Sequence, residues 1–349
     1  DFINDDDDVG DEALEPVTGR EATHGQNEHG TAVLGVLAGN DPGQLIGVAP
    51  AAEYLLAKTD DVSPSTTTVD ESELPIEEDR WVAALEWADS LGAQVVNSSL
   101  GYNRFDDGTG YDYSDLDGAT ALTTRAAELA VARGIVIVVA AGNEAAVDWH
   151  YITVPADAPG VIAVGAVHAV TGRLASFSSR GPTADGRIKP DVVAPGQSVY
   201  TVSGRGADDG ADDAFALREY RYVPGTSFAS PIVAGASALL LQQNPEWSPL
   251  QVADALRMTA TDLGPAGPDT LFGWGRIDVA RASGLDLQET SRSVADLPFP
   301  NPARGTSPTV HFPVQLTTAQ DISVALFDGS GLLVDVIDRR LPAGVYTDP

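Results

Sequence analysis

The segment that decides the fold lies at residues 134–144 and reads GIVIVVAAGNE. Ile135 to Val139 are all β-branched, and such a short apolar run is typical of a strand buried on both faces. Gly134 stands where a preceding helix would place its C′ residue. Strands buried in this way are covered by helices, so the segment predicts a parallel sheet.

Similar runs recur along the chain and extend the pattern. We expect further strands at residues 54–57, 94–97 and 161–164, and helices with apolar stripes at 82–91 and 122–129. Strands that alternate with helices predict a three-layer α/β/α fold with a mostly parallel sheet. Reactive groups in such folds gather beyond the carboxyl ends of the strands.

A further helix is predicted by a capping pattern near residue 248. Ser248 stands as N-cap, Pro249 takes the first helical position, and Gln251 follows three residues after the cap. We expect this helix to end near Thr259.

The pattern changes after residue 282, where polar and weakly patterned residues begin. Three antiparallel strands are expected at 310–314, 322–327 and 332–337, which predicts a small β-sandwich-like domain. The predicted organisation is therefore one α/β domain at 1–284, a linker at 285–297 and a β domain at 298–349.

Composition excludes several classes of function. The 349 residues carry 51 acidic and 20 basic side chains and a formal net charge of -31, which repels nucleic acid and anionic membranes. No apolar run approaches the roughly 18 residues of a membrane-spanning helix. The only lysines are Lys58 and Lys189, so we interpret the acidic surface as an adaptation to high salt, as in halophilic proteins.

Short segments around His29, Asn143 and Ser227 carry the candidate chemistry. Each polar residue is surrounded by small ones and lies near an expected helix start or strand end. Taken alone, the serine could be a helix cap, the histidine a structural imidazole and the asparagine a turn residue. Their joint occurrence favours one shared site.

The ordered set of segments resembles the subtilisin-like serine proteases, the S8 family of peptidases. The strongest matches are HGT at 29–31, AGN at 141–143 and GTSFASP at 225–231. Weaker matches fill the intervals: GVAP at 47–50, NSSLG at 97–101, SSRGP at 178–182, KPD at 189–191, APG at 194–196 and GWGRI at 273–277. The resemblance implies a secreted serine endopeptidase that cleaves polypeptides and needs no cofactor for its chemistry.

The resemblance also implies a role for each candidate residue. Ser227 would be the nucleophile that forms an acyl-enzyme, His29 its general base, and Asn143 a donor to the oxyanion. Substrate would bind along the segments that complete the site: Ser99, Leu100 and Gly101, together with Ala141 and Gly142.

The family's catalytic aspartate has no match in this chain. Asp1, Asp5 to Asp8 and Asp11 precede His29, but none follows an apolar strand and none precedes Thr-Gly or Ser-Gly. We expect the chain to begin just after that strand, and therefore to be nearly inactive while the parent protein is an active protease.

The tail resembles the C-terminal sorting domains of proteins exported by the type IX secretion system, and the resemblance covers part of such a domain. The matching segments are residues 299–303, 324–328 and 341–344. They imply a secreted or cell-surface protein, a monomer whose partner is the secretion machinery. No metal site is predicted, although calcium is common in the peptidase family and a structural calcium ion is left open.

Two other functions remain open at this stage. A serine esterase of the α/β-hydrolase class needs Gly-x-Ser-x-Gly and the order serine, acid, histidine, whereas His29 here precedes Ser227. A non-catalytic surface protein on a protease scaffold would explain the missing aspartate, but it would not need His29, Asn143 and Ser227 together.

Overall fold

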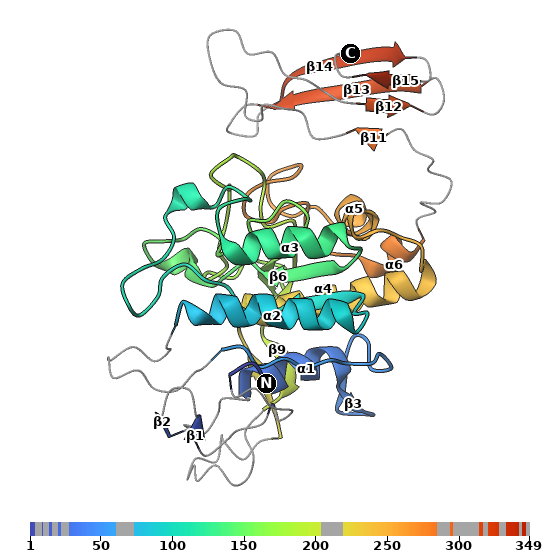
Figure 1. Cartoon of the computed structure of the whole chain (residues 1–349). Helices are drawn as coiled ribbons and strands as arrows, with labels where there is room; N and C mark the ends of the chain where they lie inside the picture. Colours follow the sequence, from blue (N-terminus) through green and yellow to red (C-terminus); the bar gives the residue numbers. More distant parts are fainter. Residues whose placement is uncertain are drawn as a thin grey trace. The chain divides into compact units, whose positions relative to one another are not determined.

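The structure is a computed structural model of the whole chain (Figure 1). It describes residues 1–3, 9, 14–15, 20–21, 28–60, 73–203 and 219–284, and the strands of the tail. The helices are α1 Glu28–Ala38, α2 Ile76–Ser90, α3 Leu122–Ala132, α4 Thr226–Gln243, α5 Pro249–Thr259 and α6 Val279–Ser283, with short 3-10 turns at Tyr113–Asp115 and Glu144–Ala146.

A parallel sheet of four strands forms the centre of the fold, in the order β5-β6-β7-β8. These strands are β5 Val95–Ser98, β6 Val136–Ala140, β7 Ile162–His168 and β8 Val192–Gln197. In register, Val96 lies opposite Ile137, and Val139 lies opposite Ala163. The expected buried strands near 94–97, 135–139 and 161–164 are thus present, and the α/β prediction is confirmed.

Helices cover both faces of this sheet, as the alternation of β6 side chains requires. Ile137 and Val139 join the core formed by α2 and α3, which lie alongside each other in Figure 1. Val136 and Val138 are equally buried and point to the other face, where α4 packs against all four strands. The result is the expected three-layer α/β/α architecture.

Local sequence signals fix the ends of two helices. Gly134 follows α3 with φ +101°, a left-handed conformation that suits glycine, as expected of a C′ residue. Ser248 accepts a hydrogen bond from the Gln251 backbone N–H, and the Gln251 side chain accepts one from the Ser248 N–H, so α5 begins with a capping box. Both helix ends are confirmed.

The expected strand at 54–57 is not a strand in the structure. Residues 53–60 have no regular secondary structure. One backbone hydrogen bond, from Phe2 N–H to the Lys58 carbonyl at 3.0 Å, joins this stretch to the first residues of the chain. An apolar run becomes a strand only when it finds a continuous backbone partner, and the described residues supply a single bond.

Short strands flank the central sheet. Of these, β9 Val199–Val202 and β10 Tyr220–Val223 form an antiparallel pair that the sequence did not predict. The others are β1 Leu14–Glu15, β2 Arg20–Glu21, β3 Asn40–Asp41 and β4 Leu45–Ile46, which pair as β1 with β2 and β3 with β4.

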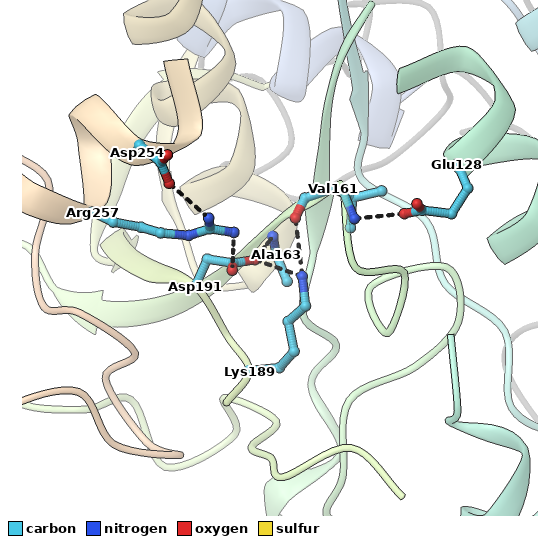
Figure 2. A network of polar contacts seen from close by, with 8 residues as sticks. Glu128, Val161, Ala163, Lys189, Asp191, Asp254 and Arg257 are labelled. Atoms are coloured by element: carbon cyan, nitrogen blue, oxygen red, sulfur yellow. Dashed lines mark hydrogen bonds and ion pairs between the residues drawn. The ribbon is translucent and has the colours of Figure 1, made fainter. Parts of the chain in front are cut away.

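A buried polar network holds β7, β8 and α5 together (Figure 2). Asp191 accepts hydrogen bonds from the Lys189 ammonium at 2.7 Å, the Arg257 guanidinium at 2.6 Å and the Ala163 N–H at 2.7 Å. Lys189 also donates to the Val161 carbonyl at 2.9 Å. Burial raises the pKa of Asp191, but the two cations outweigh it and hold the pKa below 3.8.

Both lysines of the chain are used in ion pairs that are shielded from water. Lys58 lies 3.3 Å from the Asp1 carboxylate, and Lys189 lies 2.7 Å from Asp191. The side chains of the two lysines are 9% and 2% exposed, respectively. The lysines therefore add almost nothing to the positive charge of the surface. The side chains that can offset the acidic surface are arginines.

Contacts divide the chain into two compact units: residues 1–184 with 188–283, and residues 185–187 with 284–349. In the second unit, β11 Val294–Ala295, β12 Val314–Leu316 and β15 Gly344–Tyr346 form one antiparallel sheet, and β13 Gln320–Phe327 and β14 Leu333–Leu341 form another. The expected linker at 285–297 lies outside the described residues, apart from β11, and so does most of the expected strand at 310–314.

Among the described residues, no helix has both the length and the apolar character that crossing a membrane requires.

Candidate active site

Ser227 lies in the first turn of α4, and Gly225 sets where that helix begins. Gly225 is the N-cap residue, with φ +147°, and its N–H donates to the Gly196 carbonyl in β8 at 2.7 Å. This φ favours glycine. The first turn of α4 is therefore anchored at the carboxyl end of the central sheet, and the positive end of the helix lies beside Ser227.

Pro231 leaves the Ser227 carbonyl without a partner inside the helix, because the N–H four residues later is absent in proline. The Ser99 hydroxyl supplies the missing hydrogen bond by donating to the Ser227 carbonyl at 2.7 Å. The Asn97 amide in turn donates to the Ser99 hydroxyl at 3.0 Å. The end of β5 thereby fixes the helix turn that carries Ser227.

Ser227 and Ser99 are joined by a second hydrogen bond in the opposite direction. The Ser227 hydroxyl donates to the Ser99 carbonyl at 3.2 Å. Ser227 is 8% exposed, so its hydroxyl is confined and points toward the strand segment 99–101. No hydrogen bond between Ser227 and His29 is found among the described residues; the hydroxyl must rotate to reach the imidazole.

Asn143 follows the end of β6 and is oriented by Thr226. The Thr226 N–H and hydroxyl both donate to the Asn143 side-chain oxygen, at 2.9 and 3.1 Å. A backbone N–H can only donate, so the atom that faces it must be the amide oxygen. The NH₂ group therefore points away from Thr226 and, within the described part of the chain, donates to no other residue. Asn143 is exposed, which leaves this donor open to a ligand.

His29 is the second residue of α1, a helix held in place by tight backbone approaches. A side chain on Gly35 would overlap Thr201, since its Cβ would come within 2.5 Å of the Thr201 hydroxyl oxygen. That hydroxyl donates to the Ala32 carbonyl at 2.7 Å and ties α1 to β9. The His29 ring meets the ring of Phe228 edge to face, with 5.8 Å between centroids. His29 is thus beside the residue that follows Ser227.

Burial lowers the pKa of His29 below 6.5. His29 is exposed by its surface area, and the neighbouring protein displaces only part of the water that would stabilise the imidazolium form. The neutral imidazole, which can accept a proton, is therefore the dominant form at neutral pH. A carboxylate beside the ring would raise the pKa of His29, and no described carboxylate has this effect.

An ion pair also joins the helix that carries His29 to the strand that precedes α4. The Arg221 guanidinium lies 3.4 Å from the Glu28 carboxylate, next to His29 at the start of α1. Arg221 belongs to β10, the strand that leads to Gly225. The contact fixes the start of α1 against the chain that enters α4.

The remaining candidate residues lie on either side of the Ser227 turn. Leu100 is half-buried against the α2 and α3 core, and Gly101 follows it. Ala141 is fully buried, and the Gly142 N–H donates to the Thr226 hydroxyl at 3.2 Å. The structure thus brings the segments 99–101 and 141–143 together at the first turn of α4.

Thr226 and Pro231 belong to the site but were not singled out from the sequence as acting residues. Thr226 orients Asn143. Pro231 lacks the N–H that would bond the Ser227 carbonyl within the helix, and the Ser99 hydroxyl donates to that carbonyl instead. Their position within the segment 225–231 was the available signal. The contacts that reveal their roles join Thr226 to Asn143 and Ser227 to Ser99, which are 83 and 128 residues apart in the chain, so only the fold shows them.

Among the described residues, no group of three or more histidine or acidic side chains is arranged so that it could hold a metal ion. The sequence also suggests an insertion at 204–222 whose aspartates could form an exposed loop or a calcium site; its aspartates lie at 204–218, outside the described residues.

Comparison with known proteins identifies the family of this chain. The family described as "Subtilase family" matches residues 2–275. The chain belongs to the subtilase family. This confirms the expected subtilisin-type serine peptidase at the level of family.

Individual subtilases show how far the similarity extends. Subtilisin E of Bacillus subtilis is 36% identical over 260 residues, a match that covers 74% of this chain and 56% of the relative. Subtilisin Savinase of Lederbergia lenta is 32% identical over 268 residues, which are 76% of this chain and 81% of the relative. The matched region thus spans little more than half the length of subtilisin E.

Solved structures confirm the fold. Fervidolysin of Fervidobacterium pennivorans, described as a keratinolytic enzyme related to subtilisin, superposes with a TM-score of 0.60 at 24% identity and covers 91% of this chain and 51% of that one. The prenylagaramide maturation protease PagA superposes with a TM-score of 0.54 at 26% identity, over 73% of this chain and 81% of that one.

Proposed function

We propose that this subtilase is a serine endopeptidase that hydrolyses peptide bonds through an acyl-enzyme on Ser227. The observation that carries the proposal is the Thr226 contact, which holds the Asn143 oxygen at the residue before Ser227 and leaves the exposed Asn143 NH₂ without a partner among the described residues. A scaffold that only bound other molecules would have no need of an unpaired amide donor next to a hydroxyl and an imidazole.

Acylation begins when the Ser227 hydroxyl leaves the Ser99 carbonyl and donates to His29. The imidazole takes the proton as Ser227 Oγ attacks the scissile carbonyl carbon. The tetrahedral oxyanion accepts hydrogen bonds from the Asn143 NH₂ and from the Ser227 N–H at the positive end of α4. His29 then returns its proton to the leaving amine as the C–N bond breaks.

Deacylation repeats the same steps with water as the nucleophile. His29 removes a proton from the water, the oxyanion forms again beside Asn143, and Ser227 Oγ leaves with the proton that His29 donates. Because burial lowers the pKa of His29, this base stays available to mildly acidic pH.

The proposal includes slow turnover for the 349-residue chain on its own. Desolvation is the cause of the His29 pKa shift, and no described carboxylate orients the imidazole or stabilises its charged form. In subtilisin itself, loss of the aspartate alone lowers kcat by about 3 × 10⁴. We expect a comparable deficit relative to active subtilases, measurable with a peptide anilide.

A fluorophosphonate probe tests the nucleophile directly, because it reacts with an activated serine without need for a second step. Incubation of the 349-residue chain, followed by peptide mass spectrometry, should place the adduct on Ser227. Ser227→Ala should abolish labelling, whereas Ser237→Ala, in the same helix but hydrogen-bonded to the Val233 carbonyl, should leave it unchanged.

Two outcomes would count against the endopeptidase. Absence of any adduct on Ser227 at neutral pH, even after prolonged incubation with excess probe to allow for the slow reaction expected of this chain, would favour a non-catalytic scaffold. Labelling of Ser227 together with hydrolysis of short esters, but not of casein, would favour an esterase.

The remaining properties follow from the acidic composition and the tail. We expect a monomer that is secreted or held at the cell surface by a type IX sorting domain, and that is stabilised by molar salt. The net charge of -31 supports the salt requirement, since counterions screen the self-repulsion. No cofactor takes part in the chemistry, and a structural calcium ion would be detected as a loss of thermal stability with chelator.

A further inference from the structure

One face of the antiparallel pair β9–β10 carries three tyrosines. Side chains alternate between the two faces of a strand, so Tyr220 and Tyr222 of β10 share a face, and Tyr200 of β9 lies opposite Tyr222 in register. The ring centroid of Tyr200 is 5.7 Å from that of Tyr220 and 5.1 Å from that of Tyr222. The three rings therefore form one aromatic surface, here named the tyrosine face.

The other face of the pair is packed against α1, which lies beside β9 in Figure 1. Val199 and Val223 join the apolar cluster of α1, and the Thr201 hydroxyl donates to a carbonyl of that helix. In contrast, Tyr222 is 70% exposed, and Tyr200 and Tyr220 are half-buried. Packing of the core therefore does not explain three large aromatic side chains at this surface, and such exposed patches commonly bind a partner.

Carboxylates border the tyrosine face. The Tyr220 hydroxyl donates to the Asp41 carboxylate. This hydrogen bond raises the pKa of Tyr220 to about 12, and the negative charges of Asp41 and Glu219 add to the shift. Arg221, which lies between two of the tyrosines in the chain, points to the other face and pairs with Glu28. The face thus combines carboxylates with aromatic rings, whose flat sides also attract cations.

The tyrosine face begins close to the proposed nucleophile. Tyr222 precedes Ser227 by five residues, which span at most about 18 Å. Arg221, the neighbour of Tyr222 in β10, lies 3.4 Å from Glu28, and Glu28 directly precedes His29. In the proposed mechanism, His29 gives its proton to the leaving amine. The elements packed around α1 therefore flank the part of the substrate that follows the scissile bond.

The charge of the protein decides which kind of partner suits this face. A second copy of the chain would bring a further net charge of -31 and would be repelled, as would any other strongly acidic partner. A lysine or arginine side chain would be attracted by Asp41 and Glu219, and its cation can lie over a tyrosine ring. The partner that fits both features is a basic polypeptide.

We propose that the tyrosine face binds lysine and arginine side chains of the substrate on the leaving side of the scissile bond, within about five residues of that bond. The enzyme thereby favours basic polypeptides and recognises their cations beyond the bond that it cleaves. This inference rests on the proposed endopeptidase function and specifies its substrate class.

A binding experiment tests the tyrosine face without turnover. Two short peptides, identical except that one carries arginines and the other glutamines in its second half, are titrated by NMR into the Ser227→Ala chain. The net charge attracts any cationic peptide, so the decisive comparison is between added Tyr222→Phe and Tyr222→Leu substitutions, which carry the same charge. Phenylalanine keeps an aromatic ring, whereas leucine is only apolar. Tyr222 is largely exposed, so both variants should fold.

We expect Tyr222→Leu to weaken binding of the arginine peptide about threefold relative to Tyr222→Phe, and about tenfold when Tyr200 is exchanged in the same way. Binding of the glutamine peptide should be weaker and equal in the two variants. Equal affinity of both variants for the arginine peptide, or no binding of that peptide, would overturn the inference.

Cleavage tests whether the cation binds on the leaving side. Internally quenched peptides carry arginines either after or before the same scissile bond, whereas a peptide anilide has no residue after it. Relative to Tyr222→Phe, Tyr222→Leu should lower kcat/KM about threefold for arginines after the bond and leave the anilide unchanged. An equal loss for arginines before the bond, or a loss for the anilide, would overturn this placement. If no peptide is cleaved, the proposed catalysis fails, and the binding comparison still decides the role of the tyrosine face.

Discussion

Replacing Asp191 by asparagine removes one charge from the network in Figure 2 without a large change in size. Asp191 is 4% exposed and accepts hydrogen bonds from Lys189, Arg257 and the Ala163 N–H. After Asp191→Asn, the Lys189 ammonium stays buried with the Val161 carbonyl as a neutral partner. The substitution therefore removes the carboxylate that lies 2.7 Å from this buried ammonium.

The expected loss is large compared with the total stability of a domain. Breaking a buried ion pair on one side costs about 3–5 kcal/mol, out of a free energy of unfolding of about 5–15 kcal/mol. Urea unfolding measures it, and the Ser227→Ala background prevents self-digestion. The double variant Asp191→Asn, Lys189→Met also removes the stranded ammonium and should recover much of the loss.

The sign of the pH dependence follows from the lowered pKa of Asp191. The unfolded carboxyl, with its ordinary pKa of 3.8, takes up a proton before the folded one does as pH falls. The difference in stability between wild type and Asp191→Asn should thus stay constant from pH 7 to about pH 4 and shrink as pH falls through the folded pKa. A loss below about 1 kcal/mol at pH 7, or a double variant as unstable as the sum of the singles, would refute this reasoning.

Other substitutions test separate features. Burial raises the pKa of Asp60 to about 6, although hydrogen bonds from Thr59 and Tyr102 oppose the shift. Ionisation of this carboxyl in the folded protein should therefore lower the free energy of unfolding by up to about 3 kcal/mol as pH rises from 3.8 to 6. In urea unfolding, Asp60→Asn should be more stable than wild type at pH 7 but not at pH 4. Ser99→Ala leaves the Ser227 carbonyl unpaired and should cost about 1–3 kcal/mol, while Ser99→Thr keeps the hydroxyl; equal stabilities would contradict the proline argument. Gly225→Ala forces a side chain into φ +147°, with its Cβ 3.3 Å from the Phe228 ring, and should cost about 1–3 kcal/mol in thermal unfolding. In contrast, Gly30→Ala meets nothing within 4 Å inside α1 and should stabilise the protein by about 0.5–1 kcal/mol.

The sequence predicted those parts of the fold that depend on neighbouring residues. The run 135–139 is a buried strand, Gly134 ends α3 in a left-handed conformation, and Ser248 begins α5 with a capping box. Each depends on contacts within one turn or one strand. Periodicity and capping patterns report such contacts directly.

Parts that depend on distant partners could not be predicted in this way. The run at 54–57 has strand composition but lacks a continuous backbone partner among the described residues. In the same way, β9 and β10 pair across an interval of about 17 residues, far longer than the two to five residues of a hairpin turn that a sequence pattern predicts.

The candidate site shows the same division between local and distant information. The segments that carry His29, Asn143 and Ser227 were recognisable from their composition and order. The contacts that orient them were not, because Ser99 and Ser227 are 128 residues apart in the chain.

The proline in α4 has a consequence for redesign of substrate preference. Because it transfers one carbonyl contact of the nucleophile's helix to the end of β5, the turn that carries Ser227 is tied to that strand. Leu100 can be varied to test whether the proposed substrate-binding segment decides which peptides fit, with the reactive hydroxyl left in place. Ser99 cannot, since any exchange that deletes its hydroxyl alters recognition and chemistry together.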